Sequence, residues 1–327
     1  MAGPLLVVAA TDYHTAGEPF RIVTGGVPPI PGRNILEKRR WAQEHLEHIR
    51  KLLVHEPRGH ADMYGCFVTE PDDGGADLGV LFFHNAGYST ACGHGTIALA
   101  TAAVETGMVE PAEPETGLTV DVPSGRLPVK VRVEGGRASE ASFRNVPAWV
   151  EATGLEAAGV VADVAYGGAF YASVHVRAVG LAVEPADVPA LIQLGREIKS
   201  SLEAQREFVH PEASDIRDIY GVVFWQDEGD DAGRIVQRNV TVFADGEVDR
   251  SPCGSGTSAR LALLDTDRTL LHRSVIGTEF EARVVERVDA FGRPAVVTEI
   301  AGSAHRTGTH EFVLEPDDPL GHGFLLR

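Results

Sequence analysis

The sequence predicts a mixed α/β (α+β) protein of two pseudo-symmetric lobes, each a curved, mainly antiparallel sheet around one central helix. The first observation behind this prediction is a repeat: the phrase Cys-Gly-x-Gly-Thr-x-Ala occurs at residues 92–98 and again at 253–259. The second is length, because 327 residues suffice for two units with separate cores. The third is that short strand patterns, bounded by turn residues, surround each copy of the phrase. The repeat therefore predicts two related halves, each with one thiol at the start of a helix.

In the first half, strand patterns alternate or run apolar, and two segments show helical periodicity. Residues 35–54 carry apolar side chains at helical spacing and predict a surface helix. Residues 95–104 are alanine-rich, apolar on all sides and followed by Gly107, which predicts a buried helix closed by glycine. The predicted strands are residues 3–27 (two strands and a loop), 64–70, 79–84, 118–133 (a hairpin) and 141–143.

The second half repeats this order after a crossing at residues 147–149. A surface helix is predicted at residues 188–205 and a second buried helix at 258–264, directly after the second cysteine phrase. Strands are predicted at 160–164, 170–176, 220–225 and 239–243, and further strands run to the end of the chain.

Composition and charge exclude several classes of protein. The formal net charge of −18 argues against nucleic acid and anionic membranes as partners. No apolar run reaches the length of a membrane span, and residues 5–10 are too short for a signal peptide core and predict a buried strand. Three widely spaced cysteines provide no disulfide framework, so we expect a reducing, cytoplasmic location.

The two cysteine phrases predict a chemical site. Glycines allow a tight turn, and the first N–H groups of the following helix lack partners within the helix and carry partial positive charge. Such a helix start binds a carboxylate, and we expect it to lower the pKa of a nearby thiol below the reference value of about 8.5. Cys92 and Cys253, facing one substrate from opposite sides, could invert a stereocentre without a cofactor.

Other interpretations of the same residues are weaker. A lone cysteine is usually a small buried apolar residue, and this interpretation is applied to Cys66. No Cys-x-x-Cys or paired histidine spacing indicates a metal, and the glycines of the two phrases lack the strand–helix–strand context of a dinucleotide site. The serine of the second phrase lacks the Gly-x-Ser-x-Gly pattern of a hydrolase. His14 and His60 are interpreted as structural, and Arg58 as either an ion-pair or a substrate residue.

The chain resembles the proline racemase family, which has a diaminopimelate epimerase-like fold. The matching motifs follow the family order over almost the whole chain, and the two that contain Cys92 and Cys253 are the most specific. They lie at residues 12–19, 56–60, 62–65, 91–94, 165–168, 249–256 and 302–305.

The resemblance implies roles for particular residues and a division into lobes. Cys92 and Cys253 would be the two acid–base catalysts, and Asp249 would hold the ring ammonium of an imino acid. The substrate carboxylate would lie between the two helix starts, next to Gly93, His94, Gly254 and Ser255. The final residues would return to the first lobe, which gives lobes of residues 1–147 plus 306–327 and of residues 148–305. No metal or other cofactor is expected.

The activity implied first is inversion at Cα of proline or of 4-hydroxyproline. Residues 165–172, however, resemble the trans-3-hydroxy-L-proline dehydratase branch of the family, which is the alternative. Dehydratases usually have threonine where this chain has Cys253, and inversion needs two bases whereas elimination needs one. A non-catalytic binding protein is a third hypothesis, which the second thiol disfavours. The expected partner is a small imino acid, and self-association into a homodimer is left open.

Overall fold

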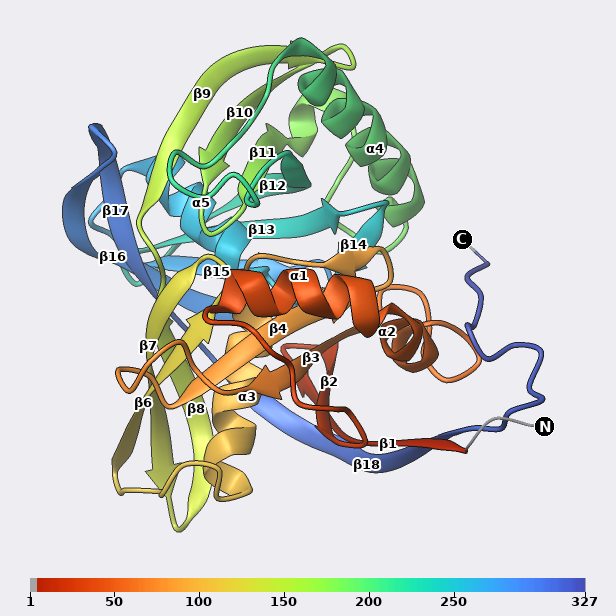
Figure 1. The fold of residues 1–327 in the computed structure, drawn as a ribbon. Helices are drawn as coiled ribbons and strands as arrows, with labels where there is room; N and C mark the ends of the chain where they lie inside the picture. Colours follow the sequence, from red (N-terminus) through yellow and green to blue (C-terminus); the bar gives the residue numbers. More distant parts are fainter. Residues whose placement is uncertain (1–4, 327) are drawn as a thin grey trace.

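The computed structural model describes residues 5–326, which form two sheet-rich halves (Figure 1). The helices are α1 (Ile35–His45), α2 (Glu47–Val54), α3 (Gly93–Glu105), α4 (Val188–Gln205), α5 (Gly254–Leu264) and the short 3-10 helix η1 (Val176–Val179). The strands of the first half are β1 (Leu6–Thr15), β2 (Glu18–Gly25), β3 (Tyr64–Thr69), β4 (Leu78–His84), β5 (Gly87–Tyr88), β6 (Glu115–Val122), β7 (Gly125–Glu134) and β8 (Arg137–Arg144). Those that follow are β9 (Ala148–Ala157), β10 (Val160–Tyr166), β11 (Phe170–His175), β12 (Ile219–Asp231), β13 (Arg234–Phe243), β14 (Glu247–Asp249), β15 (Leu270–Ser274), β16 (Glu279–Ala290), β17 (Arg293–Gly302) and β18 (Ala304–Leu314).

The strand pairing of the two halves follows the same order. In the first half the neighbours are β1, β2, β3, β4, β6, β7 and β8, with parallel pairs only at β2–β3 and β4–β6. In the second half they are β10, β11, β12, β13, β15, β16 and β17, with parallel pairs only at β11–β12 and β13–β15. This agreement confirms the predicted fold class of two pseudo-symmetric, mainly antiparallel lobes.

One further strand completes each lobe, and the two lobes are joined by a strand pair. β9 pairs with β10, and at the equivalent place the C-terminal strand β18 pairs with β1 from Leu6 to Thr15. β8 and β17 pair with each other across the two halves. Both ends of the described chain therefore lie on the first lobe (Figure 1). The lobe boundaries at residues 147 and 306 stay a proposal.

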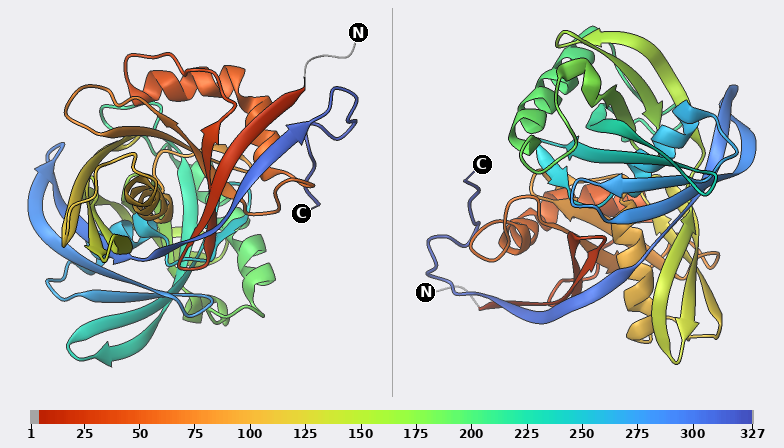
Figure 2. Two further views of the ribbon diagram at one scale, coloured as in Figure 1. Left: turned by 90° about the horizontal axis from the view of Figure 1, so that it is seen from below. Right: turned by 180° about the vertical axis from the view of Figure 1, so that it is seen from behind.

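Each lobe encloses one buried helix. Every residue from Gly93 to Val104 of α3 is buried, and α3 contacts β1, β2, β7, β8 and β18. Figure 2 shows this helix end-on, with strands around it. α5 is buried from Gly254 to Ala262 and contacts β9, β10, β16 and β17. α1 and α2 pack against β4 on the outer side of the first lobe. α4 packs against β12 and β13 on the outer side of the second lobe.

The segment 35–54 differs from its predicted single helix. The structure divides it into α1 and α2 at Leu46, whose φ and ψ are −111° and 8°. Leu46 is buried in one core cluster with Ile35 and Leu53. The break at Leu46 lets both helices pack on the same sheet, which a single straight helix would not allow. The strand β9 is also absent from the prediction, which treated its first residues as a crossing between lobes. α3 and α5 begin earlier than predicted, at the glycines of the cysteine phrases.

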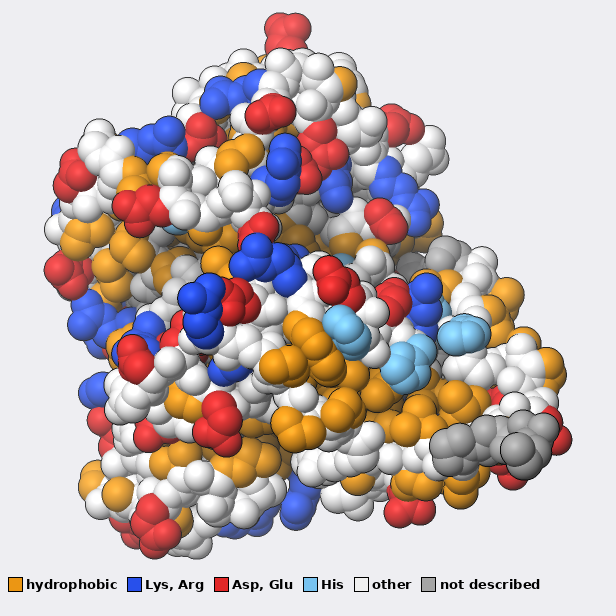
Figure 3. Space-filling model, in the orientation of Figure 1, with side chains coloured by type: hydrophobic (Ala, Val, Ile, Leu, Met, Phe, Trp, Pro, Cys, Tyr) orange, Lys and Arg blue, Asp and Glu red, His pale blue; other side chains and the backbone are white. Residues whose placement is uncertain are grey.

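On the face drawn in Figure 3, charged side chains of both signs lie among each other. Figure 3 shows lysine and arginine interspersed with aspartate and glutamate on one face. Many of them form exposed ion pairs, such as Arg283 with Glu299. Exposed pairs of this kind contribute little to stability. Among residues 5–326, no helix has the length and apolar character needed to cross a membrane.

Candidate active site

The two buried helices meet start to start at the interface between the lobes. A Cβ placed on Gly93 would lie 2.5 Å from Cα of Gly254, and one placed on Gly254 would lie 2.7 Å from Cα of Gly93. Only glycine allows the two backbone segments to approach this closely. Cys92 and Cys253 are the N-cap residues of these helices, and each is about 5% exposed. The tertiary structure thus brings both phrases of the sequence repeat to one place.

Cys92 lies in a polar environment made by its own helix and by one histidine. The backbone N–H of Gly95 donates to Sγ of Cys92 at 3.2 Å. Nε2 of His94 lies 3.4 Å from the same sulfur, and Nδ1 of His94 lies 3.5 Å from Oδ2 of Asp249. A buried chain of groups therefore runs from the first thiol to a carboxylate of the second lobe.

Cys253 has a different backbone and different neighbours. Its φ of 60° lies in the left-handed region, which is unusual for a residue other than glycine and is common at functional sites. Its backbone N–H donates to Oγ of Ser251 at 3.2 Å, and its Sγ lies 3.9 Å from the hydroxyl of Tyr171. That hydroxyl lies 2.7 Å from Oγ of Ser255. The second thiol therefore faces hydroxyl groups in place of an imidazole.

Asp249 is held by the loop that leads to Cys253. Its Oδ1 accepts hydrogen bonds from the backbone N–H and from the hydroxyl of Ser251, at 2.8 and 2.7 Å. Its Oδ2 faces His94 across the interface. All seven predicted site residues thus lie in one cluster: Cys92, Gly93, His94, Asp249, Cys253, Gly254 and Ser255.

Burial changes the expected ionisation of the thiols. It raises the pKa of Cys92 well above its ordinary value and outweighs the hydrogen bond from Gly95, which lowers it. Burial also raises the pKa of Cys253, to about 12. The negative charge of Asp249 raises both values further. The helix start of α3 does lower the pKa of Cys92 through the N–H of Gly95, as expected. The expected net pKa below the ordinary thiol value is wrong for the unliganded site, because desolvation is the larger effect.

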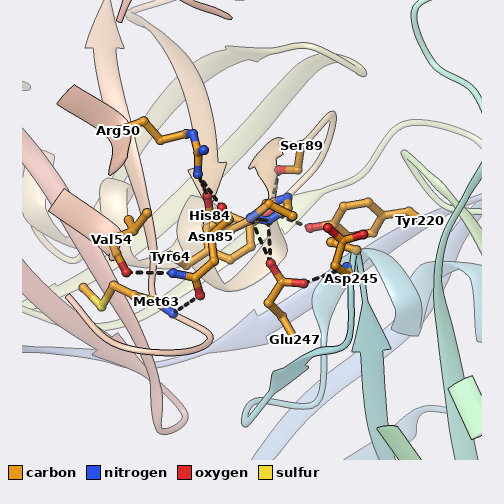
Figure 4. Close-up of polar contacts among 12 residues, drawn as sticks. Arg50, Val54, Met63, Tyr64, His84, Asn85, Ser89, Tyr220, Asp245 and Glu247 are labelled. Atoms are coloured by element: carbon orange, nitrogen blue, oxygen red, sulfur yellow. Dashed lines mark hydrogen bonds and ion pairs between the residues drawn. The ribbon is translucent and has the colours of Figure 1, made fainter. Parts of the chain in front are cut away.

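Two tyrosines that the sequence analysis did not select complete the site. Tyr64 begins β3 and Tyr220 lies at the start of the equivalent strand β12. Their hydroxyls lie 2.9 Å apart, and the hydroxyl of Tyr64 donates to Oγ of Ser89 at 2.5 Å (Figure 4). A charge on Cys92 raises the pKa of both tyrosines, so the hydroxyl pair lies near this thiol. The resemblance motif at residues 62–65 contains Tyr64, but no sequence signal identifies Tyr220.

A buried contact between a histidine and a carboxylate joins the lobes next to this hydroxyl cluster. Nδ1 of His84 lies 3.3 Å from Oε1 of Glu247, which also accepts the backbone N–H of Ala86 at 3.0 Å (Figure 4). The other carboxylate oxygen of Glu247 accepts the backbone N–H of Asp245 at 2.8 Å. These contacts fix the end of β4 against β14, the strand that ends at Asp249.

The remaining candidates lie outside the cluster of the two thiols. Cys66 is fully buried in β3, and burial raises its pKa, as expected of a core cysteine. His14 accepts the backbone N–H of Gly17 at 3.3 Å in its own turn. His60 contacts the carbonyl oxygen of Ala61, and Arg58 forms an ion pair with Asp318. Residues 5–326 contain no cluster of three or more His, Cys, Asp or Glu side chains suited to a metal ion.

The fold and the site define a two-lobed α/β protein with one thiol from each lobe at a shared buried centre. The family model for proline racemase matches residues 10–325. The 3-hydroxyproline 2-epimerase of Burkholderia multivorans is 44% identical over 98% of both chains. The trans-3-hydroxy-L-proline dehydratase of Bacillus thuringiensis is also 44% identical over 98% of both.

A solved structure agrees with these matches. The hydroxyproline epimerase of Agrobacterium vitis, with bound trans-4-hydroxy-L-proline, superposes with a TM-score of 0.90 at 32% identity, covering 100% of this chain and 97% of the other. The chain belongs to the proline racemase family and is an enzyme of this family of isomerases.

Proposed function

We propose that this enzyme inverts Cα of a ring-hydroxylated proline, 3-hydroxyproline first, by a two-thiol acid–base reaction without a cofactor. The observation that carries the proposal is the meeting of two helix starts, each capped by a cysteine, at one buried centre between the lobes. Inversion needs a base on one face of Cα and an acid on the other. One thiol from each lobe supplies this pair.

Each part of the substrate has a proposed place in the site. The first N–H groups of α3 and α5 lie at the proposed place of the carboxylate, which takes up negative charge when Cα loses its proton. Oδ2 of Asp249 receives the ring ammonium. One cysteine, as thiolate, removes the proton from Cα, and the thiol of the other cysteine donates a proton to the opposite face.

Substrate binding also favours formation of the thiolate. The negative charge of Asp249 raises the pKa of both Cys92 and Cys253 in the unliganded site. A ring ammonium bound to Asp249 compensates that charge. The first thiol therefore loses its proton more easily once the substrate is present, and the resulting charge opposes ionisation of the second.

The hydroxyl groups beside the thiols favour a hydroxylated ring over proline. Tyr64, Tyr220 and Ser89 each carry a hydroxyl that can donate to or accept from a ring hydroxyl. A ring hydroxyl would add a further hydrogen bond to this cluster, whereas proline would leave only the contacts that the three hydroxyls make with one another. This preference agrees with the names of the relatives from Burkholderia multivorans and Agrobacterium vitis.

Dehydration of trans-3-hydroxy-L-proline is the second candidate. It has a specific observation in its favour: Sγ of Cys253 lies near the hydroxyl of Tyr171, which could donate a proton to a hydroxide leaving from C3. Removal of the Cα proton would then expel water instead of being followed by protonation. The relative from Bacillus thuringiensis is named for this reaction.

One assay distinguishes these reactions. The enzyme is incubated in deuterium oxide with L-proline, trans-3-hydroxy-L-proline and trans-4-hydroxy-L-proline, and the products are followed by proton NMR and chiral chromatography. We expect the inverted, Cα-deuterated product, formed fastest from 3-hydroxyproline. Loss of water without any inverted product supports the dehydratase instead. No exchange at Cα with any of the three contradicts both reactions.

The location and partners follow from composition and the free thiols. We infer a cytoplasmic enzyme, because the three cysteines of the described chain are unpaired. The net charge of −18 disfavours nucleic acid as a partner. A homodimer is proposed as the oligomeric state, and its test is the mass in light scattering.

A further inference from the structure

Glu18 is a buried carboxylate beside the site that the reaction described above does not use. It begins β2 and its exposed fraction is 0%. Oε2 accepts the backbone N–H of Arg250 at 2.7 Å, and Nη1 of Arg250 lies 3.5 Å away. Among the described residues, Oε1 has no hydrogen-bond partner although it is buried. A buried acceptor without a partner is costly, so its presence indicates a partner that arrives with a ligand.

The contacts of Glu18 and of the turn before it bring this side chain next to the site. The N–H that it accepts belongs to the peptide bond between Asp249 and Arg250, so the two carboxylates flank one peptide group. On the preceding turn, the hydroxyl of Thr15 donates to the carbonyl oxygen of His94 at 2.9 Å. This bond fixes the β1–β2 turn against the first turn of α3.

The positive charge next to Glu18 is shared with a second carboxylate. Arg250 is shared between Glu18 and Asp62, whose Oδ2 lies 3.2 Å from Nη2. Burial and the charge of Asp249 raise the pKa of Glu18 well above its ordinary value. A charge on Glu18 in turn raises the pKa of Cys92. A positive group between Glu18 and Asp249 would relieve all of these repulsions.

We propose that Oε1 of Glu18 is a second acceptor for the ring ammonium of the substrate, beside Oδ2 of Asp249. The proposal rests on the proposed function, because it deepens the recognition of the imino acid. A secondary ammonium carries two N–H groups, and two carboxylates satisfy both. The reaction at Cα is unchanged by this contact: no bond forms or breaks at Glu18.

Pseudo-symmetry supports a role beyond structure. Glu18 pairs with Thr15 at the end of the β1–β2 turn, and at the equivalent place in the second lobe Phe170 pairs with Tyr166. Phe170 is buried in the apolar core of that lobe. A turn at this place can therefore be completed by an apolar residue, so the turn itself does not require the carboxylate of Glu18.

The test compares ligands that differ only in their ring N–H groups. The Michaelis constant for the imino acid is measured together with the inhibition constant of tetrahydrofuran-2-carboxylate, in which oxygen replaces the ring nitrogen. In Glu18→Gln the amide oxygen stays at Oε2 to accept the N–H of Arg250, so the amide NH₂ replaces Oε1 and faces the ammonium. We expect the Michaelis constant to rise about ten- to hundredfold, and the inhibition constant to change less than about twofold.

Asp62→Asn is the matched control, because it removes a carboxylate that contacts the same arginine. We expect it to shift both constants equally and by less than about threefold. Equal losses for both ligands in Glu18→Gln would overturn the proposal, since they would reveal only a structural role through Arg250. An unchanged Michaelis constant in this variant would also overturn it.

Two further measurements apply if Glu18→Gln does not fold. Glu18→Asp keeps the charge but withdraws the oxygen, and we expect it to raise the Michaelis constant alone. The wild-type enzyme is also tested with N-methylproline, which has a single N–H. Binding as tight as that of proline would overturn the proposal, whereas absence of any turnover of imino acids by the wild type would instead refute the proposed function.

Discussion

The starts of α3 and α5 carry the same phrase, but the structure makes them chemically different. Cys92 has extended backbone with φ of −154° and accepts the N–H of Gly95 as a helix cap. Cys253 has φ of 60° and no hydrogen bond that caps its helix through the side chain. The variable position of the phrase adds His94 beside the first thiol and Ser255, with Tyr171, near the second.

This difference separates two tasks within one motif. The shared glycines and helix starts provide the same main-chain surface from both lobes, which suits a substrate carboxylate. The variable residue and the backbone before it determine which groups surround each sulfur. The two thiols are therefore equivalent in position but not in environment, and each prediction below tests one side of this comparison.

The largest effect is expected from removing either thiol. Cys92→Ser and Cys253→Ser should each lower inversion about 10²–10⁴-fold, because a hydroxyl is a much weaker base than a thiolate. The measurement is the rate of formation of the inverted product by chiral chromatography. Cys66→Ala is the control and should keep the rate per folded molecule, since Cys66 lies in the core. Near-full inversion by either serine variant would contradict two-thiol catalysis.

The contact between the helix starts should be nearly as sensitive. Gly93→Ala or Gly254→Ala would place a methyl group within 2.7 Å of the opposite backbone, which must move. We expect a loss of about 1–3 kcal/mol in the free energy of unfolding and about a hundredfold loss of turnover from misplaced groups. Gly117→Ala has open space around it and should change neither. Wild-type turnover in both helix-start variants would show that the two starts need not touch.

A smaller effect is expected from the groups that distinguish the thiols. His94→Gln should slow Cα exchange about tenfold, and Tyr171→Phe less, because the contact to sulfur is 3.4 Å in the first case and 3.9 Å in the second. Deuterium incorporation into each enantiomer is the measurement. A larger loss of Cα exchange in Tyr171→Phe than in His94→Gln would contradict the prediction that His94 matters more to its thiol than Tyr171 does. Circular dichroism verifies that both variants are folded.

Acid should destabilise the second lobe with little direct effect on the chemistry. His272 is fully buried, its Nδ1 lies 2.7 Å from the hydroxyl of Thr257 on α5, and burial lowers its pKa from 6.5 to about 3. Its contribution to stability is therefore present above pH 6.5 and is lost as the pH falls towards about 3, by about 1.4 kcal/mol per pH unit.

Hydrogen exchange at pH 7 and pH 4 measures this loss. We expect α5 to lose protection before α3, because β6, at the place equivalent to β15 in the first lobe, contains no histidine. His272→Gln is the comparison variant and should flatten the pH dependence of α5. Equal loss of protection in both helices would contradict an origin at His272.

The repeat, the two buried helices and the meeting of the candidate site residues could be predicted from the sequence. Helix α4 has the predicted bounds, and the cysteine phrases identify both helix starts. These features depend on neighbours a few residues apart, such as the glycines that follow each cysteine. Periodicity and motif spacing report such local constraints directly.

The break at Leu46, the strand β9, the raised thiol pKa and the contact of Tyr64 with Tyr220 were decided by tertiary structure. Tyr64 and Tyr220 are 156 positions apart in the sequence, and Glu18 meets Arg250 from the opposite lobe. The ionisation of a thiol depends on how much water the other lobe excludes, which no local pattern contains. The sequence alone therefore determined which groups the two helix starts carry, whereas the packing of the two lobes decided their environment, because burial and charge act through space between distant segments.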